Sequence, residues 1–433
     1  MEKNSNGKKY VLIGIGFLII LLVGIGVFYF KNQFNSPKTV YTKLLDNFAS
    51  STEKMINESF DLIKKPSFSE YNINFNGSSN DRDLKNIFSI INQMKIKYTI
   101  SSDYNNKNLN MLLNVKYNDN NLINGNTSII NNRFYLDIPE LYDKALYYED
   151  DAIDGLWNIA DKEIYNTLIK ELTKILKNNL KEEYFTNNST GEINAYILDL
   201  NSKNLYTFKK TVLNDIYNND ILLDAIIRID NITKEELKNS IKEYIDNLNE
   251  DKDEFLKITI SINSSNKELE GLIIKNSEIE LELQKDNNKF NIIAKENNEN
   301  VNIGTLEMND KLFEINIGYN NSKLKLSVKT ENDNKKVVFE LNANNVSLDY
   351  NISGNKENGE FTISFKEENV TSLTINGDYK INGLEKVELK EFSNSVKITD
   401  VTEDDYNKIM TNISNNETFM KLFQDIMLFG MDI

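Results

Sequence analysis

Acidic residues between positions 150 and 161 are spaced like the ligands of a calcium-binding loop. Asp150, Asp154, Gly155 and Asp161 match positions one, five, six and twelve of an EF-hand-like pattern, and Ca²⁺ prefers carboxylate oxygens. Position three is Ala152, however, and position twelve carries Asp where a bidentate Glu is expected. Acidic residues near a helix N-terminus, which favours negative charge, explain the same pattern. We therefore predict no metal site and no cofactor, and retain Asp150, Asp154 and Asp161 only as candidate ligands.

Catalytic chemistry is restricted by two missing residue types. The chain has no histidine and no cysteine, which excludes Ser-His-Asp and Cys-His catalysis and histidine-ligated metals. Ser51 and Lys54 match a Ser-x-x-Lys pattern, but the Ser-Asp-Asn and Lys-Thr-Gly sequences that accompany it in penicillin-binding proteins are absent. A solvated helix face explains the pair better. We predict that the protein is not an enzyme, and keep a carboxylate-only enzyme as the third possibility.

The charge balance argues against nucleic acid as a partner. The chain carries a formal net charge of −16 at pH 7, whereas phosphate binding requires concentrated lysine and arginine. Its three arginines, Arg82, Arg133 and Arg228, are far apart in the sequence. We therefore predict no nucleic-acid partner.

One uncharged apolar run extends from Tyr10 to Phe30. About 20 apolar residues are enough to cross a bilayer as a helix. A cleavable signal peptide has a shorter apolar core followed by small residues, whereas bulky residues from Val27 to Phe30 end this run. The run predicts an uncleaved transmembrane signal anchor, with the membrane as a partner of residues 10–30.

The cations that flank the run predict its orientation. Lys3, Lys8 and Lys9 precede it, against Lys31 and Lys38 beyond it. Because positive charge is retained on the cytoplasmic side, we expect a single-pass protein of the cell membrane, with a cytoplasmic N-terminus and an extracytoplasmic C-terminal body.

Beyond the run, the hydrophobic period changes several times. Apolar residues at helical spacing predict a helix over 40–62, a helical block over about 154–249 and a closing helix over 403–429. Thr233 and Glu236 form a capping-box pattern. Strict alternation predicts two runs of strands joined by turns, typical of antiparallel meanders. The strands expected in the first run are 71–75, 94–100, 111–117, 122–130, 133–137 and 145–148; those in the second include 256–262, 279–283, 313–319, 324–328, 337–341 and 361–365.

These segments predict an α+β fold class. We expect a single N-terminal transmembrane helix followed by antiparallel β-meander sheets, with helices packed on one face and two related units. The expected domains are a cytoplasmic tail (1–9), the anchor (10–30), a linker (31–37), a helix with the first meander (38–150), and a helical block with a second, longer meander and C-terminal helices (151–433).

This pattern resembles the LolA/LppX type of lipoprotein carrier and also uncharacterised membrane-anchored envelope proteins of low-GC Gram-positive bacteria. The residues that carry the resemblance are the helix from Val40 to Leu62, the alternating strands, and the sequence from Phe134 to Pro139 that closes the first meander. The LolA/LppX resemblance implies a curved antiparallel sheet that holds lipid or another apolar ligand beneath helices. Carriers of that type are tethered through a cysteine, which this chain lacks.

Besides the carboxylate-only enzyme, two functions remain open at this point. The first is an extracytoplasmic, non-catalytic binding module that holds a lipid or other apolar ligand between sheet and helices. The alternative is a structural or protein-protein interaction adaptor of the cell envelope, with an envelope protein as partner.

Overall fold

The computed structural model describes residues 36–428, apart from 64, 131, 151, 152, 154–156, 158–160, 231, 297, 298, 310, 320 and 391. The described chain forms two compact units. Unit 1 takes in residues 36–60 and 161–307, and unit 2 takes in residues 61–160 and 308–428. Each unit therefore combines two stretches that are distant in sequence.

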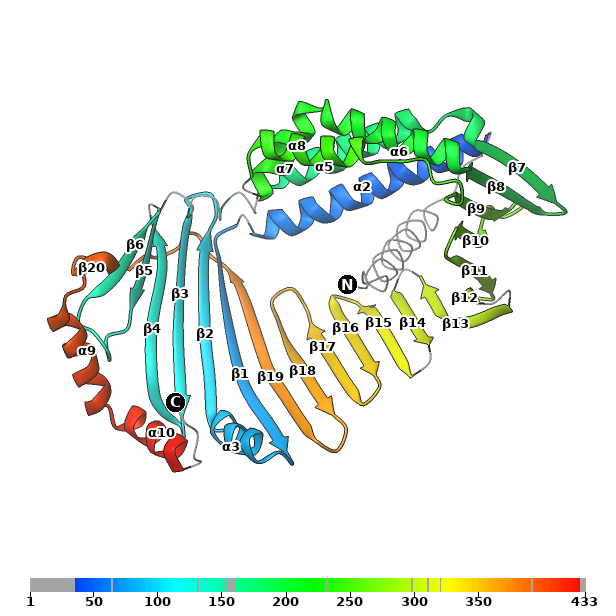
Figure 1. The fold of residues 1–433 in the computed structure, drawn as a ribbon. Coiled ribbons are helices and arrows are strands. Elements are labelled where there is room, and N and C mark those ends of the chain that lie inside the picture. The colour runs from blue at the N-terminus through cyan, green and yellow to red at the C-terminus, as the bar shows by residue number, and fades with distance from the viewer. Residues whose placement is uncertain are drawn as a thin grey trace. The chain divides into compact units, whose positions relative to one another are not determined.

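Unit 1 combines a group of helices with a seven-stranded antiparallel sheet of order β7-β8-β9-β10-β11-β12-β13 (Figure 1). Its elements are α2 (Pro37–Ile63), α5 (Lys162–Asn179), η2 (Glu182–Tyr184), β7 (Phe185–Thr190), β8 (Ile193–Leu200), α6 (Ser202–Tyr217), α7 (Asp220–Asp230), α8 (Lys234–Asp246), β9 (Leu256–Asn263), β10 (Leu269–Asn276), β11 (Glu280–Asp286), β12 (Lys289–Glu296) and β13 (Glu299–Met308).

The long helix α2 runs antiparallel to α5. Near the start of α2, Asp46 pairs with Lys177 near the end of α5 at 2.6 Å. Toward the other end of α2, the ring of Phe60 lies 5.3 Å from that of Tyr165, in the first turns of α5. Helices α5, α6, α7 and α8 then pack against one another. Most helices of this unit therefore bury their apolar faces against other helices.

Tyr41 joins α2 to the sheet. Its side chain is buried, and its hydroxyl donates to the carbonyl of Ile258 on β9 at 2.6 Å. The same hydroxyl accepts from the backbone N–H of Leu198 on β8 at 3.2 Å. Burial raises the pKa of Tyr41 far above its usual range, so the hydroxyl stays protonated and can serve as donor and acceptor.

Tyr41→Phe is expected to lower the free energy of unfolding by about 1–3 kcal/mol, because it leaves buried backbone groups without a partner. Urea unfolding followed by circular dichroism measures this loss. Tyr244→Phe on α8 is the control, since the Tyr244 side chain is 61% exposed. Equal stability of the two variants would contradict the role assigned to Tyr41.

Unit 2 is built on thirteen strands of order β14-β15-β16-β17-β18-β19-β1-β2-β3-β4-β5-β6-β20, all antiparallel except β6 with β20. Its elements are β1 (Ser67–Ser79), α3 (Arg82–Ile91), β2 (Met94–Asp103), β3 (Asn108–Tyr117), β4 (Asn120–Ile130), β5 (Arg133–Asp137), β6 (Ala145–Glu149), β14 (Leu312–Tyr319), β15 (Ser322–Glu331), β16 (Asn334–Ala343), β17 (Val346–Gly354), β18 (Asn358–Glu367), β19 (Thr371–Gly383), β20 (Ser395–Lys397), η3 (Ile398–Asp400), α9 (Glu403–Asn415) and α10 (Glu417–Leu428).

Glycines let aromatic rings lie flat against the sheet of unit 2. Gly377 on β19 lies directly opposite Phe361 on β18, and the Phe361 ring occupies the space that a side chain at 377 would need. Phe88 of α3 covers Gly77 of β1 in the same way. These positions therefore need glycine because another group approaches the backbone closely.

Helices cover the sheet of unit 2 near one end. Helix α3 packs on β1, and α10 packs on β4 and α3. Ile90, Tyr117 and Leu122 are buried there, against side chains of α10 such as Phe419 and Leu422. The Tyr117 hydroxyl donates to a carboxylate oxygen of Asp425 at 2.6 Å. This cluster is the hydrophobic core of that end.

The predicted fold class is wrong in two respects. First, β1 pairs with β19 along thirteen residues, so strands expected in two separate units lie in one sheet. Second, within residues 36–428 as described, no helix is long and apolar enough to cross a membrane, and the predicted single transmembrane helix is not supported. Residues 10–30, with Tyr10 and Phe30 at their ends, and Lys3, Lys8 and Lys9 lie outside the described residues.

Many single elements were nevertheless predicted correctly. The helix expected over 40–62 is α2, which the chain leaves shortly before Pro66, and the capping box of Thr233 and Glu236 begins α8. The expected helical block over 154–249 was wrong at one place, because the hairpin β7–β8 lies inside it. The asparagine-rich sequence 185–190 gave no alternating apolar signal, since β7 is exposed on nearly every residue.

Candidate functional site

One face of the sheet in unit 2 is apolar across successive strands. Because residues directly opposite each other in antiparallel strands share a face, the register defines three apolar rows. We call this set the apolar face. Its rows are Val328, Val337, Ile352 and Phe361; Leu326, Phe339, Tyr350, Ile363 and Ile375; and Leu324, Leu341, Leu348, Phe365 and Leu373.

The apolar face is only partly covered. No side chain of β16, β17 or β18 is buried. Leu341, Leu348 and Phe365 are 36–39% exposed. The described helices that pack on this sheet do so at β1 and β4, away from β15–β18. A sheet face with this many aligned apolar side chains usually lies against another apolar surface.

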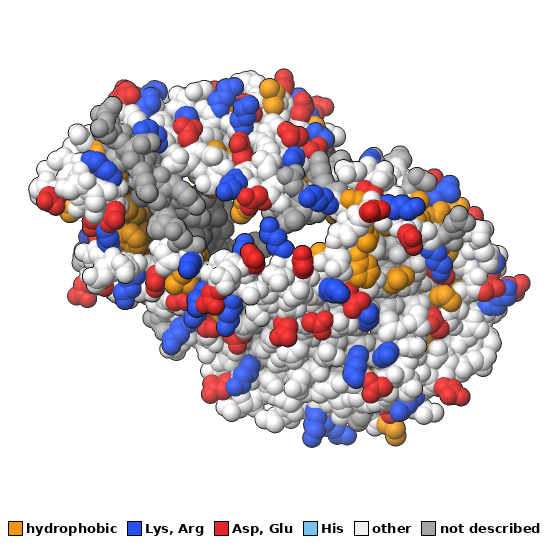
Figure 2. All heavy atoms as spheres, turned by 180° about the vertical axis from the view of Figure 1, so that it is seen from behind, with side chains coloured by type: hydrophobic (Ala, Val, Ile, Leu, Met, Phe, Trp, Pro, Cys, Tyr) orange, Lys and Arg blue, Asp and Glu red, His pale blue; other side chains and the backbone are white. Residues whose placement is uncertain are grey.

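The opposite face of the same strands is polar. Between the second and third apolar rows, the register aligns a row of residues whose side chains point to the opposite face. They are Lys325, Glu340, Asp349, Ser364 and Thr374. Figure 2 shows acidic and basic side chains interspersed over the face in view. The sheet is therefore amphipathic, and its polar face has the character of a solvated surface.

Tyrosines extend the apolar face onto β19, β1 and β2. Tyr379, Tyr71 and Tyr98 lie opposite one another in register. The rings of Tyr71 and Tyr98 are stacked, with centroids 4.6 Å apart. Burial raises the pKa of Tyr98 and of Tyr379, so both hydroxyls stay protonated. The Tyr379 hydroxyl donates to the carbonyl of Asn355 at 3.1 Å, and the Tyr98 hydroxyl supplies a hydrogen-bond donor beside an otherwise apolar surface.

The three candidate calcium ligands do not form one site in the described residues. Asp150, directly after β6 in unit 2, accepts a hydrogen bond from the Tyr148 hydroxyl. Asp161, in unit 1, caps α5 by accepting from the N–H of Glu163 at 3.1 Å, and pairs with Arg228 at 2.9 Å. Asp154 lies outside the described residues. The described residues contain no group of three or more Asp, Glu, His or Cys side chains placed to hold a metal ion.

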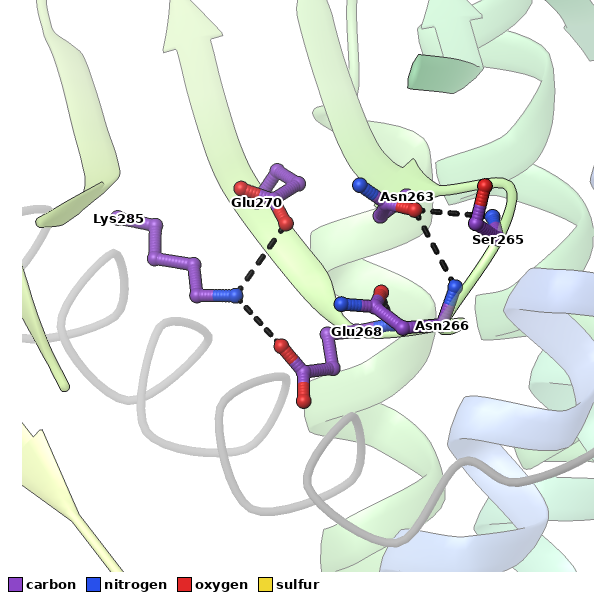
Figure 3. Close-up of polar contacts among 6 residues, drawn as sticks. All are labelled: Asn263, Ser265, Asn266, Glu268, Glu270 and Lys285. Atoms are coloured by element: carbon purple, nitrogen blue, oxygen red, sulfur yellow. Dashed lines mark hydrogen bonds and ion pairs between the residues drawn. The ribbon is translucent and has the colours of Figure 1, made fainter. Parts of the chain in front are cut away.

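The Ser-x-x-Lys pair lies on α2, where Lys54 is 78% exposed and forms an ion pair with Glu58 at 3.9 Å. A second lysine, Lys285 on β11, is better enclosed. It donates to Glu268 at 2.7 Å and to Glu270 at 3.2 Å (Figure 3). The hydrogen bond that Lys285 donates to Glu268 raises the pKa of Lys285. A lysine held in its charged form cannot act as a base or nucleophile at neutral pH.

The turn that presents Glu268 is shaped by asparagines. The side-chain oxygen of Asn263 accepts from the backbone N–H of Ser265 at 2.9 Å and of Asn266 at 3.2 Å. Asn266 in turn accepts from the N–H of Glu268 at 2.9 Å (Figure 3). Such side-chain turns are a common structural use of asparagine. The cluster therefore links β9, β10 and β11.

The Lys285 ion pairs predict a pH dependence of stability. The pKa of Lys285 is higher in the folded protein than in the unfolded chain. The ion pairs therefore contribute fully to the free energy of unfolding below the ordinary lysine pKa of about 10.4, and this contribution is lost as pH rises through the folded-state pKa. The difference in unfolding free energy between the wild type and Lys285→Met should be constant from about pH 7 to 9 and shrink above about pH 10.4. Urea titrations at several pH values measure it. Lys289→Met, at an exposed lysine of β12, is the control; a difference that grows with pH would contradict the assignment.

The sequence placed many residues of the apolar face on strands and predicted an apolar ligand between sheet and helices, but it did not predict β17 or the alignment of the three rows. The alignment can be predicted from the turns, by asking whether the apolar residues of two consecutive strands lie at positions that pair across the hairpin. Leu341 and Leu348 are seven residues apart and lie opposite each other across the hairpin β16–β17. The same apolar phase recurs at Ile352 and Phe361 across the next hairpin. Consistent phase over several hairpins predicts one continuous apolar face.

Comparison with known proteins identifies no family. No protein-family model and no curated protein matches the chain. Among solved structures, an engineered protein from work on asymmetric conductivity is 5% identical, with 73% of this chain and 99% of that chain covered and a TM-score of 0.17. OccK5 (OpdH) of Pseudomonas aeruginosa is 7% identical, with 74% and 97% covered and a TM-score of 0.14. A mutant of transferrin binding protein B from Haemophilus parasuis is 7% identical, with 73% and 76% covered and a TM-score of 0.11. Similarity this low carries no argument about fold or function.

Proposed function

We propose that the protein is a non-catalytic binding module whose apolar face in unit 2 accepts a lipid acyl chain. The observation that carries the proposal is the set of three aligned apolar rows on strands without a buried side chain from β16 to β18. An acyl chain matches this surface because it is long, flat and free of polar groups. The neighbouring Tyr98 hydroxyl is suited to a polar head group.

The expected gain in free energy is sufficient for binding. Each methylene removed from water contributes about 0.8 kcal/mol, so about ten methylenes against the face would contribute roughly 8 kcal/mol before ordering costs. Lost translational and rotational freedom costs about 4 kcal/mol or more, so the acyl chain alone is expected to bind with an affinity in the millimolar range, which head-group contacts would strengthen. Exposed apolar side chains such as Leu341 and Phe365 would lose water in the same step.

The proposal is tested with the protein purified without detergent. Mass spectrometry of an organic extract should find co-purified lipid, and the delipidated protein should bind a fluorescent fatty acid saturably. If neither lipid nor saturable fatty-acid binding is found, the proposal fails.

A protein-protein adaptor is the second candidate, and one observation favours it. Strand β7 in unit 1 pairs with β8 alone among the described strands and carries no charged residue. Native edge strands usually carry charges or proline that block pairing with another chain. Crosslinking in intact cells should recover a reproducible protein partner if β7 accepts an added strand; no such partner would count against the adaptor.

A further inference from the structure

A groove of about 460 Å³ lies in unit 2 over β2, β3, β4 and β5. It is formed mainly by side chains that point away from the apolar face, because they alternate with Tyr98, Ile100 and Leu113 along their strands. A volume of this size suits a small ligand. Its lining residues include Thr99, Leu112, Asn114, Asn124, Asn126 and Asp137, with Lys97 and Lys390 at its margin.

One row of side chains across four strands forms the floor of this groove. The register aligns Thr99, Leu112, Asn126 and Asp137 in that order. Asn126 is 6% exposed and Asp137 is 8% exposed, whereas Leu112 is 47% exposed. The floor therefore combines buried polar side chains with one accessible aliphatic side chain. Buried polar groups that line a groove are costly unless they find partners.

The buried polar groups of the floor keep hydrogen-bonding capacity. Lys390 donates to Asp137 Oδ2, and the Ser128 hydroxyl lies 3.2 Å from Asn126 Oδ1. These contacts use Asp137 Oδ2 and Asn126 Oδ1, so Asp137 Oδ1 can accept a hydrogen bond from a ligand and Asn126 Nδ2 can donate one. One donor and one acceptor, directly opposite in register, are thus available side by side.

A second row supplies further amides. Lys97, Asn114 and Asn124 are aligned in register next to the floor. The Asn114 amide donates to Asn124, and the Asn124 amide donates to Glu140 Oε1. Glu140 Oε2 is buried and has no partner among the described residues. This chain of hydrogen bonds orients the two amides beside the groove.

Both lysines that line the groove are paired with carboxylates. Lys97 pairs with Glu70 at 2.8 Å, and Lys390 pairs with Asp137. A free anion would therefore meet no unpaired lysine at these residues, and the buried Oε2 of Glu140, which does not line the groove, offers a free cation no accessible ligand. A neutral ligand with several hydroxyl groups fits better, because each hydroxyl both donates and accepts. Leu112 offers an apolar contact for the C–H face of a sugar ring.

We propose that this groove binds a neutral saccharide, with Asn126 and Asp137 hydrogen-bonded to its hydroxyls and Leu112 against its ring. The site is separate from the apolar face and does not depend on the function proposed above. It predicts a second ligand of a different chemical class on the opposite side of the same sheet.

Isothermal titration calorimetry on the full chain, with maltotetraose, cellotetraose and chitotetraose as probes, tests the proposal. At least one probe should bind saturably below about 10 mM, a range accessible for weak ligands. Leu112→Ala and Asn114→Ala should each weaken that binding by about tenfold or more. Neither residue is buried, so the thermal midpoint should change little, and two variants guard against loss of folding in one of them.

The matched control is Ser364→Ala on β18, which points to the same side of the sheet but does not line the groove. It should leave saccharide binding unchanged. The proposal is overturned if none of the three probes binds, if both groove variants bind as tightly as the wild type, or if inorganic phosphate binds more tightly than every saccharide. Binding of a fluorescent fatty acid by Leu112→Ala should equal that of the wild type, which separates this site from the apolar face.

Discussion

Ile363→Asp is expected to lower the affinity for a fatty acyl chain by about a hundredfold or more. Ile363 lies in the middle row of the apolar face, between Tyr350 on β17 and Ile375 on β19. A carboxylate there would have to lose water when the ligand binds, with no cation beside it on that face. Titration of the delipidated protein with a fluorescent fatty acid measures the change.

Ser364→Asp is the matched control, because the adjacent residue on the same strand points to the polar face. It adds the same charge to the same strand, opposite Asp349 and Thr374. Ser364→Asp should retain fatty-acid binding within about threefold. If both variants lost binding equally, a general effect on the strand would explain the result and the apolar face would not be the site. Thermal unfolding of both variants checks that they are folded.

Gly377→Val is expected to destabilise unit 2 by about 1–3 kcal/mol or more, because it places a side chain where none fits. A Cβ atom at position 377 would lie 2.6 Å from the backbone oxygen of Asn72 on β1, and it would also overlap the Phe361 ring on β18. The ring can move, but the backbone oxygen belongs to the β1–β19 ladder. Chemical unfolding followed by tyrosine fluorescence measures the loss.

Gly383→Val is the control on the same strand. A Cβ atom at position 383 would meet nothing within 4 Å, so this variant should be as stable as the wild type or slightly more stable, since valine favours strands. Equal stability of the two valine variants would show that β1 and β19 are not held as closely as described. The prediction therefore tests the pairing that joins the two meanders.

The local elements of this protein follow from residue order. Alternation at Met94, Ile96 and Tyr98 predicted β2, and alternation at Val337, Phe339 and Leu341 predicted β16. These patterns succeed because side chains on a strand point to opposite faces, so a one-sided apolar surface leaves a period of two in the sequence. Capping at Thr233 was predictable for the same local reason, since its hydrogen bonds stay within one helical turn.

The acidic candidates show where local reasoning ends. Asp161 was a possible calcium ligand in the sequence, yet its carboxylate caps α5 and pairs with Arg228, which lies 67 residues away. The buried row of Asn126 and Asp137 went unnoticed for the converse reason. Asparagine at 126 and aspartate at 137 are ordinary turn and surface residues in a sequence, and only their alignment with Thr99 and Leu112 places them in one groove.

By itself, the amino-acid sequence determined where apolar residues repeat every two residues, as on strands, or every 3.6 residues, as on helices, and which face of each element is apolar. The sequence also excluded chemistry that needs histidine or cysteine. The tertiary structure decided that β1 pairs with β19, although 292 residues separate Ser79 from its partner Thr371. Strand pairing between distant segments depends on which complementary edges meet when the chain collapses, and many strands of this chain carry the same alternation. That long-range pairing carries the apolar face onto Tyr71 and Tyr98, whereas the three apolar rows and the groove each lie on strands joined by consecutive hairpins.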